Sequence, residues 1–218
     1  MPAAARRALC YVTDRHLLGP EEEARVDALV EQIRRGVAAG IDWIQIREKD
    51  LSGRRLSELT RDAVAAAAGT ATRIIVNDRL DIALGRGAAG VHLGEESVPV
   101  AEVTRWRRTD AAQRHFLVGA SCHSLAAAQQ AERDGADYVF FGPVFDTPAK
   151  RKFGPPQGLD RLAEVCRAVR VPVLAIGGVT LENAADCLRS GAAGLAAIRL
   201  FQEAPDLPAI VARLRSDA

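Results

Sequence analysis

Polar and charged residues follow directly after short apolar segments at several places along this sequence. The positions are Thr13-Asp14, Gln45 to Lys49, Asn77-Asp78, His92, Ser121 to His123, Thr147 to Lys150, Gly177-Gly178 and Ile198-Arg199. They combine cations, carboxylates, amides, hydroxyls and imidazoles, which can bind anions, hold a metal ion and move protons. If the fold brings them to one end of the molecule, they form a single polar site.

The motif QIREK carries two cations at alternate positions. Alternate side chains of a strand share a face, so Gln45, Arg47 and Lys49 are expected to point together, while the residues between them point away. Two cations directed into a fold are costly unless an anion meets them. The motif therefore predicts an anion site. An internal salt-bridge network with Asp14 or Asp78 is the alternative, and both roles can coexist.

Asn77-Asp78 follows an apolar run that ends at Val76. A carboxylate in this place can bind a hard cation such as Mg²⁺, which prefers oxygen ligands and often bridges to substrate phosphate. The alternative is a helix N-cap, a favoured role for Asn or Asp before the helix expected from Leu80.

Gly177-Gly178 follows the apolar run VPVLAI. Glycine lets the backbone approach a phosphate closely, and the N–H groups at a helix N-terminus suit anions. The alternative is a plain tight turn. The loop that opens at Thr147 is long enough to close over a ligand, and its Lys150 can meet a second anion. A solvated basic loop is the alternative there, because Lys150, Arg151 and Lys152 are consecutive.

His92 and His123 stand at expected strand ends or in early loops, where either can act as an acid or base near neutral pH. A structural role is the alternative for each. The inventory is two anion sites, one divalent ion and no obvious nucleophile. Joining or splitting phosphorylated small molecules fits it, whereas hydride transfer and proteolysis do not.

Eight short apolar segments alternate with stretches of helical period, which predicts a single compact (β/α)8 barrel over residues 1–218. The expected strands are Leu9–Thr13, Trp43–Arg47, Arg73–Asn77, Gly90–Leu93, Phe116–Ala120, Tyr138–Phe141, Val171–Ile176 and Gly194–Ile198. The expected helices are Glu21–Ala39, Gly53–Ala67, Leu80–Arg86, Val100–Arg107, Leu125–Asp134, Leu159–Ala168, Leu181–Ser190 and Pro208–Arg215. A doubly wound open sheet is the alternative, but it more often has five or six strands. In such a barrel, every polar position named in the first paragraph lies at the carboxyl end of a strand, where active sites form.

The composition limits the partners. The 29 basic and 28 acidic side chains nearly cancel, so no overall field draws the chain to nucleic acid or a membrane. The four cysteines have no metal-ligand spacing, and no apolar run has the length of a signal peptide or a membrane span. We expect a cytoplasmic protein with reduced thiols, and a homo-oligomer is possible.

The ordered motifs YVTD, QIREK, IIVNDRLDIAL, GVHLG, GASCHS, DYVFFGPVFDTPAK, AIGG and GAAGLAAI resemble the thiamine phosphate synthase family from Tyr11 to about Phe201. The resemblance implies a (β/α)8 barrel that joins hydroxymethylpyrimidine diphosphate to hydroxyethylthiazole phosphate and releases diphosphate, with Mg²⁺ as cofactor. It implies that the pyrimidine diphosphate is bound by Gln45, Ile46, Arg47, Glu48, Lys49, Asn77, Ser121 and Lys150, with Arg47, Lys49 and Lys150 in catalytic roles. It assigns the thiazole phosphate to Thr147, Pro148, Ala149, Gly178, Ile198 and Arg199, and the metal to Asp78.

Three positions depart from the family pattern. Ser97 stands where the family has a second magnesium-binding Asp, Ala149 replaces a Thr, and Arg199 replaces a Ser. Arg199 can compensate by gripping phosphate with two hydrogen bonds.

Two other functions remain open. The chain also resembles the TenI-type thiazole tautomerases, which move a proton without metal, at DIAL, at Ser97 and at CHS. In that reading His123 is the acid or base. A barrel that binds a thiazole or pyrimidine phosphate without turnover is the other alternative, and Ser97 is the feature that invites it.

Overall fold

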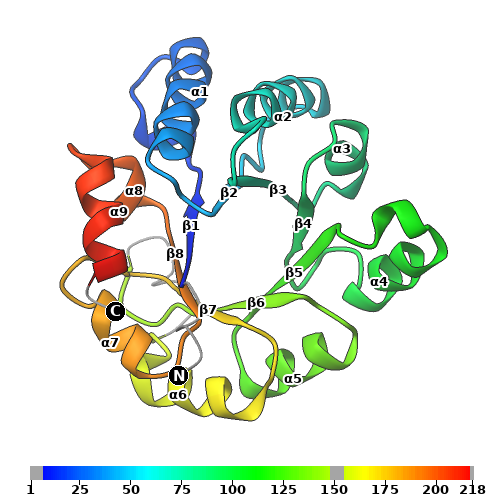
Figure 1. Ribbon diagram of the computed structural model, residues 1–218, viewed down its shortest axis with the longest axis vertical. Helices are drawn as coiled ribbons and strands as arrows, with labels where there is room; N and C mark the ends of the chain where they lie inside the picture. The colour runs from blue at the N-terminus through cyan, green and yellow to red at the C-terminus, as the bar shows by residue number, and fades with distance from the viewer. Residues whose placement is uncertain (1–6, 148–154, 217–218) are drawn as a thin grey trace.

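The computed structural model describes residues 7–147 and 155–216. Eight parallel strands close into a barrel in which each strand pairs with the next and β8 pairs with β1. The helices surround the barrel on the outside (Figure 1). The predicted (β/α)8 barrel is confirmed, and the open sheet is excluded by the β1–β8 pairing.

The strands agree with the prediction to within a few residues. They are β1 Ala8–Val12, β2 Trp43–Ile46, β3 Arg73–Asn77, β4 Gly90–Leu93, β5 Leu117–Cys122, β6 Tyr138–Phe141, β7 Val173–Ile176 and β8 Gly194–Ala197. Strand β7 begins later than predicted, after Pro172, which has no N–H to donate to a neighbouring strand. Strand β2 ends at Ile46, so the polar residues of QIREK after this point lie in a loop.

The helices are α1 Glu22–Ala38, α2 Gly53–Ala67, α3 Leu80–Gly85, α4 Val100–Thr109, α5 Leu125–Arg133, α6 Gly158–Ala168, α7 Ala184–Arg189, α8 Arg199–Gln202 and α9 Leu207–Ser216. Two short 3₁₀ helices, η1 Arg15–Leu17 and η2 Ala111–Gln113, and helix α8 were not predicted. Elements this short contain no full hydrophobic repeat, so periodicity cannot reveal them. Helix α7 is shorter than predicted because residues 181–183 form a turn before it.

The strands are buried on both faces. Inside the barrel, the buried residues Cys10, Val12, Tyr138, Phe140, Leu174 and Ala196 form one hydrophobic cluster. A larger cluster, which includes Ile44, Ile46 and Val76, joins the outer face of the sheet to the helices. Burial on both faces explains why these strands are continuously apolar, as a parallel sheet requires.

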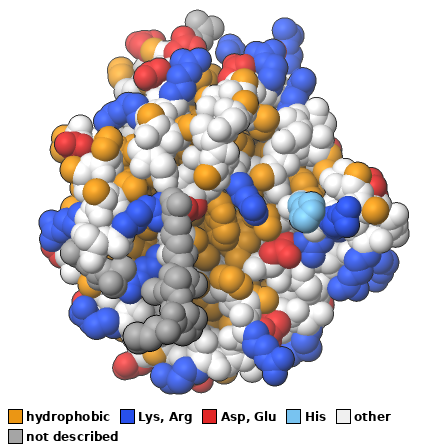
Figure 2. Space-filling view, in the orientation of Figure 1, with side chains coloured by type: hydrophobic (Ala, Val, Ile, Leu, Met, Phe, Trp, Pro, Cys, Tyr) orange, Lys and Arg blue, Asp and Glu red, His pale blue; other side chains and the backbone are white. Residues whose placement is uncertain are grey.

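All four cysteines are free in the structure, and Cys10, Cys122 and Cys187 are buried. Burial raises the pKa of the Cys122 and Cys187 thiols to about 12, so both stay protonated near neutral pH. Within the described ranges, no helix combines the length and the apolar character that crossing a bilayer demands. On the face in Figure 2, basic and acidic side chains are interspersed around the periphery.

Gly119 on β5 leaves the space that the Tyr138 ring occupies. A Cβ at this position would lie 2.1 Å from Cζ of Tyr138. We expect Gly119→Ala to cost about 1–3 kcal/mol of unfolding free energy, because overpacking forces a buried ring out of place. Gly85→Ala is the matched control, since a Cβ there meets nothing within 4 Å. Urea unfolding of both variants is the measurement, and equal stabilities would contradict the packing argument.

Candidate active site

The carboxyl ends of β2 and β3 bring three predicted residues into contact. Gln45 Nε2 donates to Asn77 Oδ1 over 3.0 Å, and Asn77 Nδ2 donates to Asp78 Oδ2 over 2.6 Å. Gln45 is 2% exposed, and Asn77 and Asp78 are half-buried. Residues 32 positions apart are thus joined because neighbouring parallel strands end at the same edge of the barrel.

The Asp78 carboxylate is the centre of this cluster. Its Oδ1 accepts from the Gly94 N–H over 3.2 Å and from the Ser97 hydroxyl. Its backbone has a φ of 61°, in the left-handed region that Asp tolerates better than most residues. The N-cap of α3 is Arg79, so the alternative role of Asp78 as a helix cap is wrong. Its side chain is turned instead toward the loop after β4.

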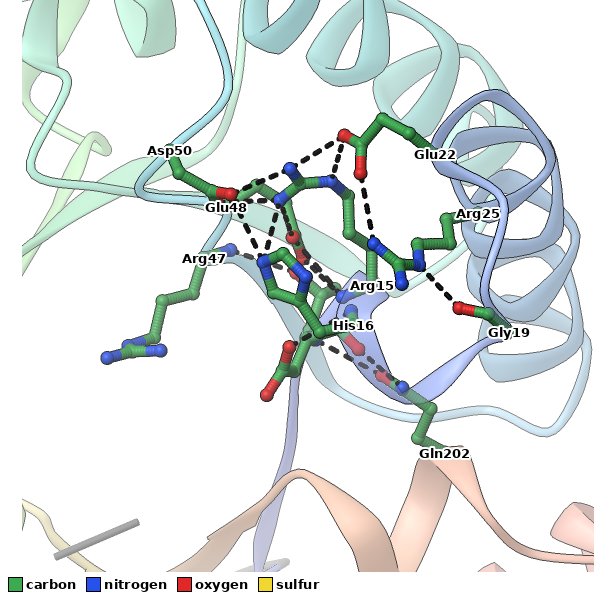
Figure 3. Close-up of polar contacts among 11 residues, drawn as sticks. Arg15, His16, Gly19, Glu22, Arg25, Arg47, Glu48, Asp50 and Gln202 are labelled. Carbon is green, nitrogen blue, oxygen red and sulfur yellow. Dashed lines mark hydrogen bonds and ion pairs between the residues drawn. The ribbon is translucent and has the colours of Figure 1, made fainter.

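The two cations of QIREK differ in exposure. The Lys49 side chain is 59% exposed, with Nζ 3.8 Å from Asp78 Oδ2, so the expected ion pair with Asp78 is present. Arg47 is half-buried, and in Figure 3 its guanidinium points away from the ion pairs around Arg15. Ile46 is fully buried, and the carboxylate of the buried Glu48 is bonded to Thr13 and Arg15. The side chains of Ile46 and Glu48 therefore contact other protein groups.

A cavity of about 240 Å³ lies beside this cluster. It is lined by Glu48, Lys49, Leu51, Leu56, Asn77, Asp78 and Arg79. Five of these residues come from the loops after β2 and β3, so the opening is polar on the side of Asp78. It is smaller than a typical ligand pocket of roughly 300–1,000 Å³, so it fits part of a ligand.

His92 and Ser121 form a second contact between predicted residues. His92 Nε2 lies 2.9 Å from Ser121 Oγ, and Nδ1 lies 3.2 Å from the Tyr138 hydroxyl. Burial lowers the pKa of His92 to about 3, so the ring is neutral at pH 7. The contacts and burial of His92 therefore favour the structural alternative over a role as an acid or base. Its contact instead orients the Ser121 hydroxyl.

His123 is half-buried after β5, and its Nδ1 contacts the Gly142 carbonyl oxygen. A carbonyl only accepts, so Nδ1 carries the hydrogen and the lone pair of the neutral ring is on Nε2. The ring is thus held in one tautomer. This arrangement leaves Nε2 as the atom that could exchange a proton with a ligand.

Gly177 and Gly178 both have positive φ, of 92° and 68°. A Cβ on Gly178 would lie 2.7 Å from the Asp146 carbonyl oxygen, so glycine is required for packing against the loop after β6. The predicted phosphate role of Gly178 stays a prediction. Helix α7 begins at Ala184, three residues after the predicted start at Leu181, so the glycines are further from a helix N-terminus than expected.

Thr147 is half-buried at the end of the first described range. Pro148, Ala149 and Lys150 lie outside the described residues, so their predicted roles have no structural counterpart here. Ile198 is half-buried directly after β8 and is the N-cap of α8, which Arg199 begins. The Arg199 side chain is 61% exposed and pairs with Glu203 over 2.6 Å.

Arg199→Ser tests whether this cation holds an anion. An exposed ion pair contributes about 0–1 kcal/mol, so losing the Glu203 contact should change stability little. We expect the variant to bind inorganic phosphate about 3- to 10-fold more weakly, because a charged donor is lost. Arg34→Ser, which breaks a similarly exposed pair with Glu31, is the control. Lower thermal stability with unchanged phosphate affinity would show that Arg199 stabilises the fold through its ion pair with Glu203 and does not bind the anion.

Arg15 was not singled out from the sequence, although it forms the densest set of ion pairs near the site. Its side chain is 3% exposed and contacts Glu22, Glu48 and Asp50. Gly94 and Tyr138 were missed as well. Burial and contacts between loops reveal these three residues, and neither can be read from the sequence. The sequence does contain one signal for Arg15: the acidic residues Glu48 and Asp50 alternate with the cations Arg47 and Lys49.

The oxygen donors that converge beside Lys49 are the Asp78 carboxylate and the Ser97 hydroxyl. Mg²⁺ is commonly bound through one or two carboxylates together with substrate phosphates. Across residues 7–147 and 155–216, no group of three or more His, Cys, Asp or Glu side chains surrounds a possible metal position. One carboxylate and one hydroxyl would suit Mg²⁺ only together with phosphate oxygens from a ligand.

The fold and the site define a (β/α)8 barrel with a polar site, containing both carboxylate and cations, at the carboxyl ends of its strands. The sequence model of the family described as thiamine monophosphate synthase matches residues 9–201, and the chain belongs to this family.

Similar proteins agree. The chain is 39% identical to the thiamine-phosphate synthase of Roseiflexus castenholzii, over 94% of this chain and 86% of that protein. It is 42% identical to the thiamine-phosphate synthase of Anaeromyxobacter dehalogenans, over 86% and 82%. The solved thiamine phosphate pyrophosphorylase from Pyrococcus furiosus has a TM-score of 0.81 and 32% identity, covering 98% of this chain and 96% of that one.

Proposed function

We propose that this protein is a thiamine phosphate synthase. It joins hydroxymethylpyrimidine diphosphate to hydroxyethylthiazole phosphate and releases diphosphate. The observation that carries the proposal is the juxtaposition of Lys49 Nζ and the Asp78 carboxylate, 3.8 Å apart, beside the Gln45–Asn77 hydrogen bond. A cation and a carboxylate at one place suit a diphosphate and its counter-ion, and the chain's membership of the thiamine monophosphate synthase family supports this assignment.

The reaction needs charge neutralisation rather than a protein nucleophile. The C–O bond between the pyrimidine methylene group and the diphosphate breaks, and its electron pair leaves with the diphosphate. The lone pair of the thiazole nitrogen then forms the new C–N bond. Arg47 and Lys49, with Lys150, would neutralise the departing charge. Holding both substrates together supplies much of the rate.

The remaining residues would bind and orient the substrates. Gln45, Asn77 and Ser121 offer amide and hydroxyl groups to the pyrimidine diphosphate. Asp78, with Ser97 beside it, would hold Mg²⁺, which when bound adds positive charge at the leaving group. The thiazole phosphate would meet Thr147, Pro148, Ala149, Gly178, Ile198 and Arg199.

A direct assay tests the proposal. Both substrates are supplied with Mg²⁺, and thiamine phosphate and released diphosphate are measured together. We expect equal amounts of the two products, none when either substrate is omitted, and none with a chelator. Failure to form thiamine phosphate at any Mg²⁺ concentration would overturn the proposal. Isomerisation of thiazole phosphate without metal, abolished in His123→Ala, would identify a tautomerase, and binding without turnover would identify a regulator.

A cytoplasmic location and small phosphorylated ligands, rather than nucleic acid or membrane, accompany the proposed function. The near-zero net charge of +1 agrees with small ligands rather than nucleic acid or a membrane surface. Assembly into a homo-oligomer stays a prediction.

A further inference from the structure

Arg15 lies where the end of β1 meets the loop between β2 and α2, and the proposed chemistry does not use it. Its guanidinium is nearly buried, at 3% exposure, and so is the Glu48 side chain, at 1%. Removing charges from water is costly, and a pair like this is weak support for stability by itself. A buried pair can still fix the geometry of the segments it joins.

The Glu48 carboxylate connects two segments of the rim. It accepts from the Thr13 hydroxyl over 2.6 Å, from the Arg15 N–H over 3.2 Å and from Arg15 Nη1 over 3.1 Å. Thr13 Oγ1 in turn accepts from the Arg47 N–H over 2.9 Å. One buried threonine therefore holds both the backbone of Arg47 and the side chain of Glu48.

Asp50 repeats the attachment two residues further on. It accepts two hydrogen bonds from the Arg15 guanidinium, at 2.7 and 2.8 Å (Figure 3). Alternate residues of the loop are thus tied to Arg15, while Arg47 points away from it and Lys49 lies beside Asp78. Because the loop is attached to Arg15 at Glu48 and Asp50, the positions of Arg47 and Lys49 in the same loop are restricted.

We propose that Glu48, held by Thr13 and Arg15, is a positioning residue that sets Arg47 and Lys49 for a diphosphate group. The inference rests on the proposed function, since it assigns a diphosphate to these cations. Glu48 itself contacts no substrate in this account. Its effect passes through the backbone of residues 47–49.

Glu48→Gln is the first test, with inorganic diphosphate as the calorimetric probe in the presence of Mg²⁺. The amide keeps the size of the side chain but places an N–H₂ group against donors of Arg15. We expect diphosphate to bind about 3- to 10-fold more weakly, while the binding of inorganic phosphate at Arg199 is unaffected. In the assay, KM for the pyrimidine substrate should rise more than KM for the thiazole substrate.

A double-mutant cycle shows whether Glu48 acts through Lys49. If it does, Glu48→Gln changes diphosphate affinity less in a Lys49→Ala background than in the unaltered chain. The inference would be overturned if Glu48→Gln reduced diphosphate affinity by the same factor in the unaltered chain, in the Lys49→Ala background and in the Arg47→Ala background. Glu22→Gln is the matched control: it removes a carboxylate from the same guanidinium at its solvent end, where Glu22 is 51% exposed. An equal loss in this control would assign the effect to charge alone.

A second pair of variants covers the case in which Glu48→Gln does not fold. Thr13→Val removes the hydroxyl that links Arg47 to Glu48, and Thr13→Ser restores it. We expect weaker diphosphate binding in the first and near-normal binding in the second; unchanged binding in both overturns the inference. If the unaltered chain binds diphosphate and the cycle is non-additive but no thiamine phosphate forms, the proposed function fails and the positioning role stands. No diphosphate binding by the unaltered chain would overturn both.

Discussion

Replacing Lys49 by alanine is expected to weaken the binding of diphosphate strongly and that of phosphate hardly at all. A charge-assisted hydrogen bond contributes about 1.5–3 kcal/mol, which corresponds to about 10- to 100-fold in affinity. The lower part of this range is expected, because the Lys49 side chain is 59% exposed and water competes for its charge. The loss should appear with inorganic diphosphate and with the pyrimidine substrate alike.

The control for Lys49→Ala is Arg54→Ala in the neighbouring helix α2. Arg54 is 87% exposed and pairs with Glu58, so its removal takes away the same charge from the same region without touching the site. Calorimetry with diphosphate and with thiazole phosphate separates the outcomes. Equal losses for the two ligands in Lys49→Ala would remove the assignment of this residue to the leaving group.

The fold was predictable because each strand and helix of the barrel has a recognisable pattern in its own stretch of sequence. The run VPVLAI and the phrase RDGADYVFF show a buried strand or a glycine that ends a helix, and these signals depend only on neighbouring residues. The errors occur where a tertiary contact decides the structure. Helix α8 is only four residues long, and Gln202 within it bonds to Tyr11 and to the backbone of Asp14.

The sequence predicted which residues lie together at the site, but not which of them form hydrogen bonds with one another. Strand topology alone places Gln45, Asn77 and Asp78 at one edge. The pairing of Asp78 with Ser97 depends on how the loop after β4 folds back, which no short-range pattern encodes. The pKa of His92 depends on its burial against Tyr138 and Phe140, which come from a strand about 46 residues further along the chain.

The pairing of Asp78 with Ser97 bears on the metal. A serine hydroxyl can donate to Asp78 Oδ1, as it does here, whereas a carboxylate in its place could not. The arrangement present is thus satisfied without a cation, and Mg²⁺ would have to displace the hydroxyl hydrogen bond. We expect weak Mg²⁺ binding to the protein alone and tighter binding once diphosphate supplies oxygen ligands.

Ser97→Asp should therefore change the response to Mg²⁺ strongly. Without metal, the new carboxylate lies beside Asp78 with no hydrogen to share, so like charges repel and the thermal midpoint should fall. With Mg²⁺, the cation lies between two carboxylates, and the concentration giving half-maximal activity should drop by about tenfold or more, because a second charged ligand is added.

Thermal midpoints and activity, each measured against Mg²⁺ concentration, test this prediction independently. A ligand that binds only the folded state raises the midpoint by an amount that increases with the logarithm of its affinity, so Mg²⁺ should stabilise Ser97→Asp more than the unaltered chain. Ser97→Asn is the matched control, since it has the size of Asp without the charge and should show no such gain. If Mg²⁺ stabilises all three proteins equally, Asp78 and residue 97 do not share a metal. If thiamine phosphate also forms at the full rate with a chelator present, the leaving group is neutralised by Arg47 and Lys49 without a divalent ion.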